Sequence, residues 1–236
     1  MRHRTINTSP ARRRRAGRVG LLTLCLLTTA LLAGCQVAGV IGSTWDATKE
    51  VDIPAEYRGL DGKRVVVLVD APMDIYYEFP GITSTLTLLI SNGIIEYCPG
   101  SLVPPTEEVI AFQYNNVYWA TMDYAELCAE LRTERIVIID LIEYRLQAPG
   151  NSYLWDGRIS ADVHVIEADS FDPSSFAYSK RVLSLFPGIE GVSRESASQA
   201  QIAQGLQIKF AQKVVRLFHD HKRINSELQD EKRLEG

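Results

Sequence analysis

Cys35 has the most specific chemical setting in this 236-residue chain, because of the residues that precede it. Its thiol directly follows the small residues Ala33 and Gly34, which leave the backbone open to a processing enzyme. An apolar run over 19–32 comes before them, and it is short for a membrane span, which takes about 20 residues. A leader with seven arginines and no acidic residue comes first. A basic leader, a short apolar run and small residues before a cleavage point are the three parts of a secretory signal.

The segment Leu32-Ala33-Gly34-Cys35 resembles the lipobox of bacterial lipoproteins, in which an aliphatic residue and two small residues precede a cysteine. The resemblance implies cleavage before Cys35, a diacylglycerol thioether on its sulfur and a fatty acyl group, such as palmitate, on its new α-amino group. Each buried methylene is worth about 0.8 kcal/mol, and two or more chains make anchoring lasting. Gln36, in place of an aspartate, favours the periplasmic face of the outer membrane by the same resemblance. An ordinary signal peptide and an Arg-rich organelle transit peptide are the alternatives.

Charge and length divide the remainder of the chain. Seven of the 25 basic residues lie in 1–34 and all 29 acidic residues lie beyond it, so the chain from Cys35 has a net charge near −11. Nucleic-acid binding relies on cations that neutralise phosphates, so no nucleic-acid partner is expected. We predict a signal peptide at 1–34, a lipidated cysteine and flexible tether at 35–62, one domain at 63–222 and a charged tail at 223–236.

Hydrophobic periodicity predicts an α/β domain, with α+β as the alternative, in which helices pack on a mixed sheet. Strands are expected at 65–69, 94–98, 136–146, 159–165 and 178–186, and helices at 81–92, 106–115, 118–130 and 196–221. Asn92-Gly93 is interpreted as a helix stop. The turn 148–151 joins a predicted hairpin near 136–168, because proline presets one φ angle and glycine supplies a positive one.

This order of elements is similar to that of a group of bacterial envelope proteins. The group comprises the curli-secretion channel lipoprotein, the lipoprotein activators of peptidoglycan synthases and the N-terminal domain of the translocation protein TolB. The resemblance covers about residues 63–222 and rests on the element order, the strand 136–144 and the lipobox. The lipid anchor, the tether, a compact acidic domain and the absence of a catalytic constellation lead us to expect a non-enzymatic lipoprotein that binds or helps to assemble another envelope component. The resemblance to the channel member implies a further possibility, a subunit of a ring-shaped secretion assembly. The membrane-inserting amphipathic stretches of the channel members are not identified in this sequence.

Cys98 and Cys128 are the two cysteines that remain beyond the lipidation site. In an exported protein they can form a disulfide, which would stabilise the fold by roughly 3–4 kcal/mol. Cysteine also packs as a small hydrophobe, so two separate buried thiols are the alternative. The sequence leaves both possibilities open.

Carboxylates mark a possible enzyme site, and they are Asp70, Asp74, Glu78, Asp140 and Glu143. The first three follow a predicted strand, where α/β folds often place sites. A lipid-tethered hydrolase or ligand-binding domain that uses Asp70, Asp74 or Glu143 is therefore the main alternative function. The structural alternative is that one of Asp140 and Glu143 pairs with Arg145 or Arg158, and that the carboxylates at the strand end only lead the chain out of the core.

A dense aromatic and polar segment offers a possible partner contact through Tyr114, Asn116, Tyr118 and Trp119. Tyrosine and tryptophan favour interfaces when they are exposed. The alternative is that Tyr118 and Trp119 fill the core between two helices.

His219 and His221 flank Asp220 and form the most ligand-like group in the sequence. Two histidines two residues apart on a helix point in different directions, unlike an i, i+4 pair. Their neighbours Lys222 and Arg223 suit the negative end of a helix. We therefore expect no metal site, and no motif predicts a cofactor.

Overall fold

The computed structural model describes residues 50–170, 172, 175–188 and 192–224. These residues fall into two units, a main unit from Ile53 to His221 and a small unit with residues 50–52 and 222–224. The elements are β1 (Glu50–Ile53), β2 (Val65–Asp70), α2 (Met73–Glu78), α3 (Ile82–Tyr97), α4 (Thr106–Asn115), η1 (Trp119–Thr121), α5 (Tyr124–Glu130), β3 (Arg135–Arg145), β4 (Gly157–Glu167), β5 (Tyr178–Phe186), α6 (Gln199–Val215) and β6 (His221–Ile224). No helix in this part of the chain is long and apolar enough to cross a membrane.

β1 and β6 form a two-stranded sheet that belongs mostly to the small unit. Within that unit, Lys222 Nζ lies 3.6 Å from Glu50 Oε2. Residues 223–224 were predicted to begin the charged tail, but they lie in β6. The predicted signal peptide, Cys35 and the tether up to residue 49 lie outside the described residues.

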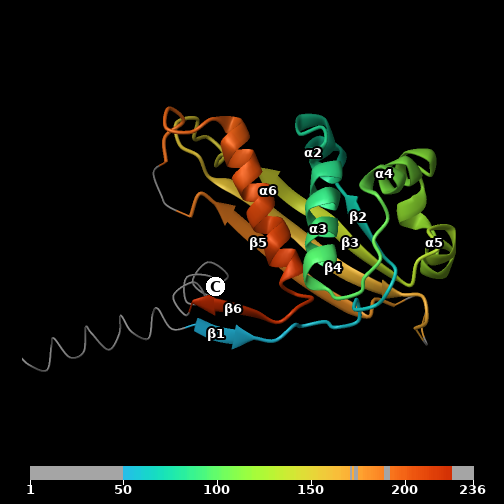
Figure 1. The fold of residues 1–236 in the computed structure, drawn as a ribbon. Coiled ribbons are helices and arrows are strands. Elements are labelled where there is room, and N and C mark those ends of the chain that lie inside the picture. Colours follow the sequence, from blue (N-terminus) through green and yellow to red (C-terminus); the bar gives the residue numbers. More distant parts are fainter. Residues whose placement is uncertain (1–49, 171, 173–174, 189–191, 225–236) are drawn as a thin grey trace, which may run out of the picture. The chain divides into compact units, whose positions relative to one another are not determined.

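The main unit contains a four-stranded mixed sheet with the order β2-β3-β4-β5 (Figure 1). β2 and β3 are parallel, in a register that pairs Asp70 with Asp140, and the other two pairs are antiparallel. β3 and β4 form the predicted hairpin, and Gly150 in their connection has a φ of +77°. The mixed sheet packed by helices confirms the predicted α/β class.

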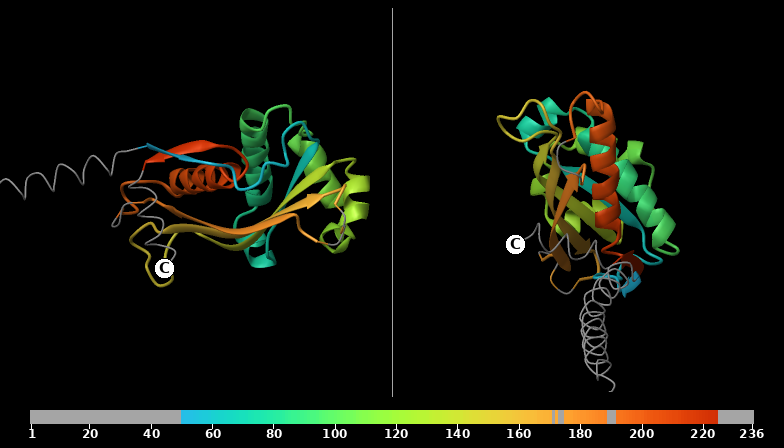
Figure 2. Two further views of the ribbon diagram at one scale, coloured as in Figure 1. Left: turned by 90° about the horizontal axis from the view of Figure 1, so that it is seen from below. Right: turned by 90° about the vertical axis from the view of Figure 1, so that its left-hand side faces the viewer.

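One face of this sheet, which we name the closed face, is covered by α3 and α6. Alternation along β2 places Val65, Val67 and Val69 on this face, and each is at most 1% exposed. Leu86 from α3 and Phe210 from α6 are fully buried in the same cluster. Both views in Figure 2 show α6 running alongside β5. Burial of this apolar area, at about 25 cal/mol per Å², is the main force that holds the layers together.

The opposite face, which we name the half-covered face, is packed over β2, β3 and the end of β4 that carries Ile166. Val66 and Ile136 on this face contact a smaller cluster that α4, η1 and α5 cover with Val109, Trp119 and Leu127. Farther along the strands this face is polar, because it carries residues such as Asp140, Asp162 and Arg181 from β3, β4 and β5. The sheet therefore has one apolar face and one face that is apolar at one end of the strands and polar farther along them.

The outer edge of β5 is partly occupied by side chains of α6. Lys213 Nζ donates to Leu183 O at 2.9 Å, and Lys209 Nζ donates to Leu185 O at 3.0 Å. Lysine is a common device against strand addition at an open edge. This half of the edge is therefore poorly suited to accept another strand.

The predicted helix stop at Asn92-Gly93 and the weak strand at 94–98 are wrong, because α3 continues to Tyr97. A Cβ on Gly93 would lie 2.5 Å from Val215 Cγ2 on α6. The glycine therefore serves close packing of two helices, and does not end one. Sequence reasoning could not distinguish these uses without knowing that α6 packs there.

Two other predicted helices are longer than the observed ones. The helix expected at 118–130 is divided into η1 and α5, with Asp123 as the N-cap that accepts from Ala125 N. The long helix expected at 196–221 spans Gln199–Val215. Its start is fixed by Ser198, which forms a capping box with Gln201.

The tether prediction is wrong for the part of 35–62 that belongs to the main unit. Leu60 is 1% exposed and belongs to the core of the closed face. The backbone N–H groups of Glu56 and Tyr57 both donate to Leu217 O, at 2.8 and 3.0 Å. The main unit therefore begins about ten residues earlier than predicted, because one apolar side chain and two backbone bonds hold this segment.

Cys98 and Cys128 are both free and buried. Cys98 belongs to the core of the closed face and Cys128 to the cluster on the half-covered face. Since the sheet lies between these clusters, the structure contradicts the disulfide alternative. Burial raises the pKa of the Cys98 thiol to about 11, and burial also raises the pKa of Cys128. Both are packing residues in this fold.

Candidate functional site

The end of α4 carries exposed aromatic side chains. Asn116 Nδ2 donates a 2.9 Å hydrogen bond to Phe112 O, which satisfies one of the carbonyls at the helix end. Tyr114 in the last turn of α4 is 82% exposed, and Val117 and Tyr118 just after the helix are 72% and 77% exposed. Tyrosine side chains with an accessible ring and a polar tip are suited to protein interfaces.

The four residues predicted to contact a partner separate into different environments. Tyr114 and Tyr118 are exposed, whereas Trp119 is 7% exposed and packs in the cluster under α4 and α5. The core alternative therefore holds for Trp119 but not for Tyr118. Asn116 is half-buried and serves the helix end. Contact between the exposed tyrosines and a partner stays a prediction.

A second exposed group, which sequence reasoning missed, lies on α2. Met73, Tyr76 and Tyr77 are 64%, 49% and 74% exposed, while Ile75 between them is buried. The rings of Tyr76 and Tyr77 meet edge to face, with centroids 6.2 Å apart. The signal was the adjacent tyrosine pair in a very short helix, where only one position can face the core.

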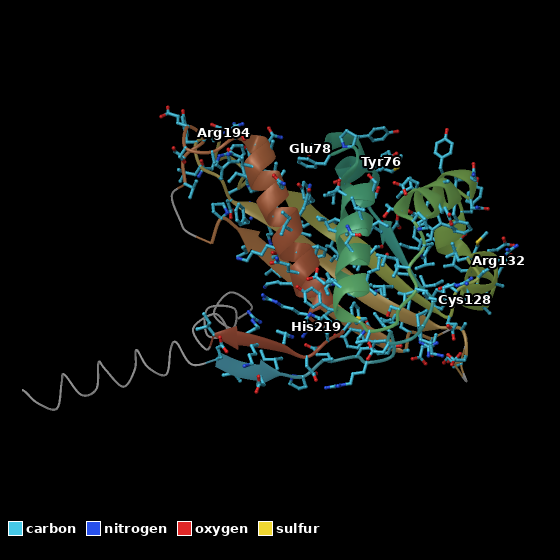
Figure 3. All side chains as sticks on the ribbon, viewed as in Figure 1. Tyr76, Glu78, Cys128, Arg132, Arg194 and His219 are labelled. Carbon is cyan, nitrogen blue, oxygen red and sulfur yellow. The ribbon has the colours of Figure 1, made fainter. Side chains whose placement is uncertain are left out.

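Both groups lie at the carboxyl end of β2. α2 begins four residues after Val69, and Gln113 Nε2 near the end of α4 donates to Val69 O at 3.1 Å. Figure 1 shows α2 and α4 at this same end of the main unit, and Figure 3 labels Tyr76 there. We name the combined set the tyrosine surface, and its members are Met73, Tyr76, Tyr77, Tyr114, Val117 and Tyr118. Exposed apolar groups that gather in this way mark interaction sites more often than scattered ones do.

A row of aspartates crosses the half-covered face from the same end of β2. The strand register aligns Asp70 with Asp140, Asp140 with Asp162, and Asp162 with Arg181. Partial burial raises the pKa of Asp140. His164 opposes this effect, and the charges of Asp70 and Asp162 raise the pKa further by smaller amounts. Two 2.8 Å hydrogen bonds from Arg181 lower the pKa of Asp162. The pKa values of two neighbouring carboxyl groups, Asp140 and Asp162, are therefore shifted in opposite directions.

His164 stands beside this row on β4. Its Nε2 atom lies 3.5 Å from Asp140 Oδ2, and its ring stacks on Phe176 with centroids 4.0 Å apart. Phe176 in turn stacks on Tyr124 at 5.1 Å. The structure therefore brings a carboxylate and a histidine together, which the hydrolase alternative requires, but the carboxylate is Asp140 and the ring is held by packing.

The carboxylates named for the hydrolase alternative have other surroundings. Of the two carboxylates in the structural alternative, Glu143 is the one that pairs with the arginines, because it accepts from Arg145 Nε at 2.8 Å and lies 2.9 Å from Arg158 Nε. Asp70 accepts from the backbone N–H of Ala71 at the strand end. Asp74 lies in the first turn of α2. Glu143 is therefore already neutralised by two guanidinium groups.

The histidine pair near the end of the main unit forms local contacts. The ring of His219 stacks on Tyr97 with centroids 4.5 Å apart. Asp220 accepts from Ala55 N at 2.8 Å and also binds Arg58. In the described residues, no group of three or more histidine, cysteine, aspartate or glutamate side chains could hold a metal ion. The Asp220 carboxylate thus anchors the segment that precedes β2.

Known proteins offer limited comparison. No protein-family model matches the chain, and no curated protein matches it in sequence. Among solved structures, it is similar to the PelC dodecamer from Paraburkholderia phytofirmans, with 11% identity, 72% of this chain and 97% of that chain covered, and a TM-score of 0.42. It is also similar to the lipoprotein GNA1162 from Neisseria meningitidis, with 12% identity, 64% of this chain and 95% of that chain covered, and a TM-score of 0.41. A third similar structure is that of a putative lipoprotein from Caulobacter crescentus, with 12% identity, 64% of this chain and 82% of that chain covered, and a TM-score of 0.32. Likenesses at this level carry no conclusion about function.

Proposed function

We propose that this chain is a non-enzymatic lipoprotein of the bacterial envelope, anchored through Cys35, whose main unit binds or helps to assemble another envelope component. The observation that carries the binding role is the tyrosine surface, in which six large side chains lie exposed at one end of the sheet. The lipobox sequence supports the anchor. The outer membrane is the proposed location, since Gln36 follows the cysteine.

The anchor and the surface have separate roles in this proposal. Acyl chains on one residue confine the protein to the bilayer, where each buried methylene contributes about 0.8 kcal/mol. Confinement raises the local concentration of a partner in the same membrane, so a modest contact is sufficient. Tyrosines suit such a contact, because they provide area with few rotatable bonds.

The anchor is tested by feeding cells labelled palmitate and comparing Cys35→Ser with Cys25→Ser. Cys25 lies in the apolar part of the leader and is the matched control. We expect the label on wild type and on Cys25→Ser, and its loss for Cys35→Ser. Label on Cys35→Ser equal to that on wild type would contradict the anchor.

The binding surface is tested by photo-crosslinking in intact cells, with benzoylphenylalanine in place of Tyr118. Leu102 is the control, because it is 62% exposed and lies on the connection between α3 and α4. We expect a discrete adduct from position 118, reduced when Tyr76 and Tyr77 are changed to serine, and none from position 102. Equal adducts at both positions would contradict the proposal. An adduct of twice the chain mass would identify self-association, as a ring subunit requires.

The hydrolase alternative keeps one supporting observation, the Asp140–His164 contact. It predicts that Asp140→Asn abolishes turnover of ester or amide substrates while the tyrosine surface is unaffected. Our proposal expects no hydrolysis above buffer by the wild type, and crosslinking from position 118 that is unchanged by Asp140→Asn.

A further inference from the structure

A groove on the main unit lies apart from the aspartate row. Two cavities of about 440 Å³ each share Glu78, Phe79, Leu146 and Gln199 in their walls, so they adjoin and together form the groove. One cavity extends between the starts of α3 and α6 to Gln207, and the other extends along the β3–β4 connection. Their combined size falls in the range of ligand sites.

The centre of the groove is apolar. Phe79 and Leu146 belong to both cavities, and Phe79 meets Tyr144 edge to face with ring centroids 4.5 Å apart. Leu146 is 4% exposed, so its side chain forms part of the groove surface and does not protrude into the groove. A ligand that follows the groove therefore places its middle against hydrocarbon.

The groove carries two charges of opposite sign. Glu78 lines both cavities and Arg194 lines the one beside the β3–β4 connection. Within the described parts of the chain, neither side chain has an ion-pair partner within 4.0 Å. Figure 3 labels both, near the start of α6. Arg145, which also lines the groove, is different, because Glu143 and Asp156 bind its guanidinium at 2.8 and 2.7 Å.

We propose that this groove binds an extended zwitterionic peptide segment, with a cationic group beside Glu78, an anionic group beside Arg194 and an apolar side chain between them. The walls also present amides suited to peptide groups. Gln199 lines both cavities and carries both donors and an acceptor. Gln207 is fixed by a 3.0 Å hydrogen bond to Tyr144 Oη.

The aromatic side chains of the groove favour a peptide over an oligosaccharide. Sugar rings stack on open aromatic faces, but Arg194 lies 4.8 Å from the ring centroid of Trp155 and covers it. Trp155 is also 6% exposed, and its Nε1 donates to Ala197 O. Tyr144 is 5% exposed and edge-on to Phe79. The groove therefore provides hydrocarbon and paired charges, and no open aromatic platform among these rings.

The test measures fluorescence anisotropy of labelled peptides with the full-length chain in detergent micelles. Each peptide has blocked termini, a central leucine flanked by alanines, and end residues that are lysine and aspartate in either order, two lysines, or two aspartates. Wild type should prefer a zwitterionic peptide. Glu78→Lys should shift the preference to the peptide with two aspartates, and Arg194→Glu to the one with two lysines. Each exposed charge pair should change affinity about two- to five-fold.

Glu195→Lys is the matched control, because Glu195 is exposed beside Arg194 and lines neither cavity. It should leave the wild-type preference unchanged. Absence of peptide binding, equal affinity for the four peptides, or a wild-type preference for two lysines would overturn the proposal. Displacement of the peptide by a neutral tetrasaccharide would also overturn it, in favour of a sugar ligand. These residues are not members of the tyrosine surface, so the crosslinking result at position 118 stands or fails separately.

Discussion

The two faces of the four-stranded sheet differ in what covers them. The closed face is buried beneath α3 and α6, and its residues from β2 are at most 1% exposed. On the half-covered face, α4, η1 and α5 pack over β2 and β3, and the remaining strands present aspartates and arginines. The apolar face therefore supports the fold, and the helices at the border of the half-covered face carry the exposed tyrosines that we propose as the partner contact.

The largest expected effect is on the closed face. Phe210 is fully buried there, so Phe210→Ala should lower the free energy of unfolding by about 3–5 kcal/mol. Trp119→Ala on the half-covered face should cost less, because the short helices around it can relax into the space. Urea unfolding followed by circular dichroism measures both. Equal losses would break the comparison.

A smaller loss is expected where the helices of the closed face meet. Gly93→Ala places a Cβ 2.5 Å from Val215 Cγ2 and should cost about 1–3 kcal/mol. The reverse change on the partner, Val215→Ala, removes the atom that clashes. The double variant should therefore recover part of the loss in the same unfolding measurement, and additive losses would contradict close packing as the reason for Gly93.

The two cysteines report on the faces separately. Burial raises the pKa of both thiols, so each should react with iodoacetamide only after local opening. Cys128 lies on the short helix α5 and should react several-fold faster than Cys98, which lies under the closed face. Mass spectrometry of a labelling time course gives both rates. Faster labelling of Cys98 would reverse the proposed order of stability.

The smallest expected effects concern the aspartate row. The pKa of Asp140 is raised in the folded state, so the free energy of unfolding falls as pH rises from the carboxyl's unfolded pKa through its folded pKa. Asp140→Asn should therefore be stabilising at neutral pH. The pKa of Asp162 is lowered, so its contribution is present at neutral pH and lost as pH falls through the folded value. Asp162→Asn should therefore be destabilising at neutral pH, by less than about 1 kcal/mol for an exposed pair.

Thermal unfolding between pH 3 and pH 7 distinguishes the two aspartates. The difference between each variant and wild type should shrink toward pH 3, with opposite signs at pH 7. Equal signs at pH 7 would mean that Arg181 and the buried setting of Asp140 do not act as the structure indicates.

Much of the sheet was predictable from sequence. The apolar run 65–69 and the alternation of apolar and polar residues in 159–165 identify strands, because the order of neighbouring residues indicates which faces are buried. The β3–β4 hairpin follows from the turn residues around Gly150. The candidate sites were less predictable. Tyr118 and Trp119 are adjacent and chemically alike, yet one is exposed and the other buried, and only the packing of α4 against η1 and α5 distinguishes them.

The sequence by itself determined the α/β class and the main strands, and it contains the lipobox-like segment before Cys35, since each depends on residues close together in the chain. The tertiary structure decided the separate burial of Cys98 and Cys128, the use of Gly93 in helix packing, and the placement of Glu78 and Arg194 in one groove. Those outcomes depend on residues separated by 30 to more than 100 positions, which meet only when the helices and the sheet pack together. A local pattern of side chains contains no information about such meetings.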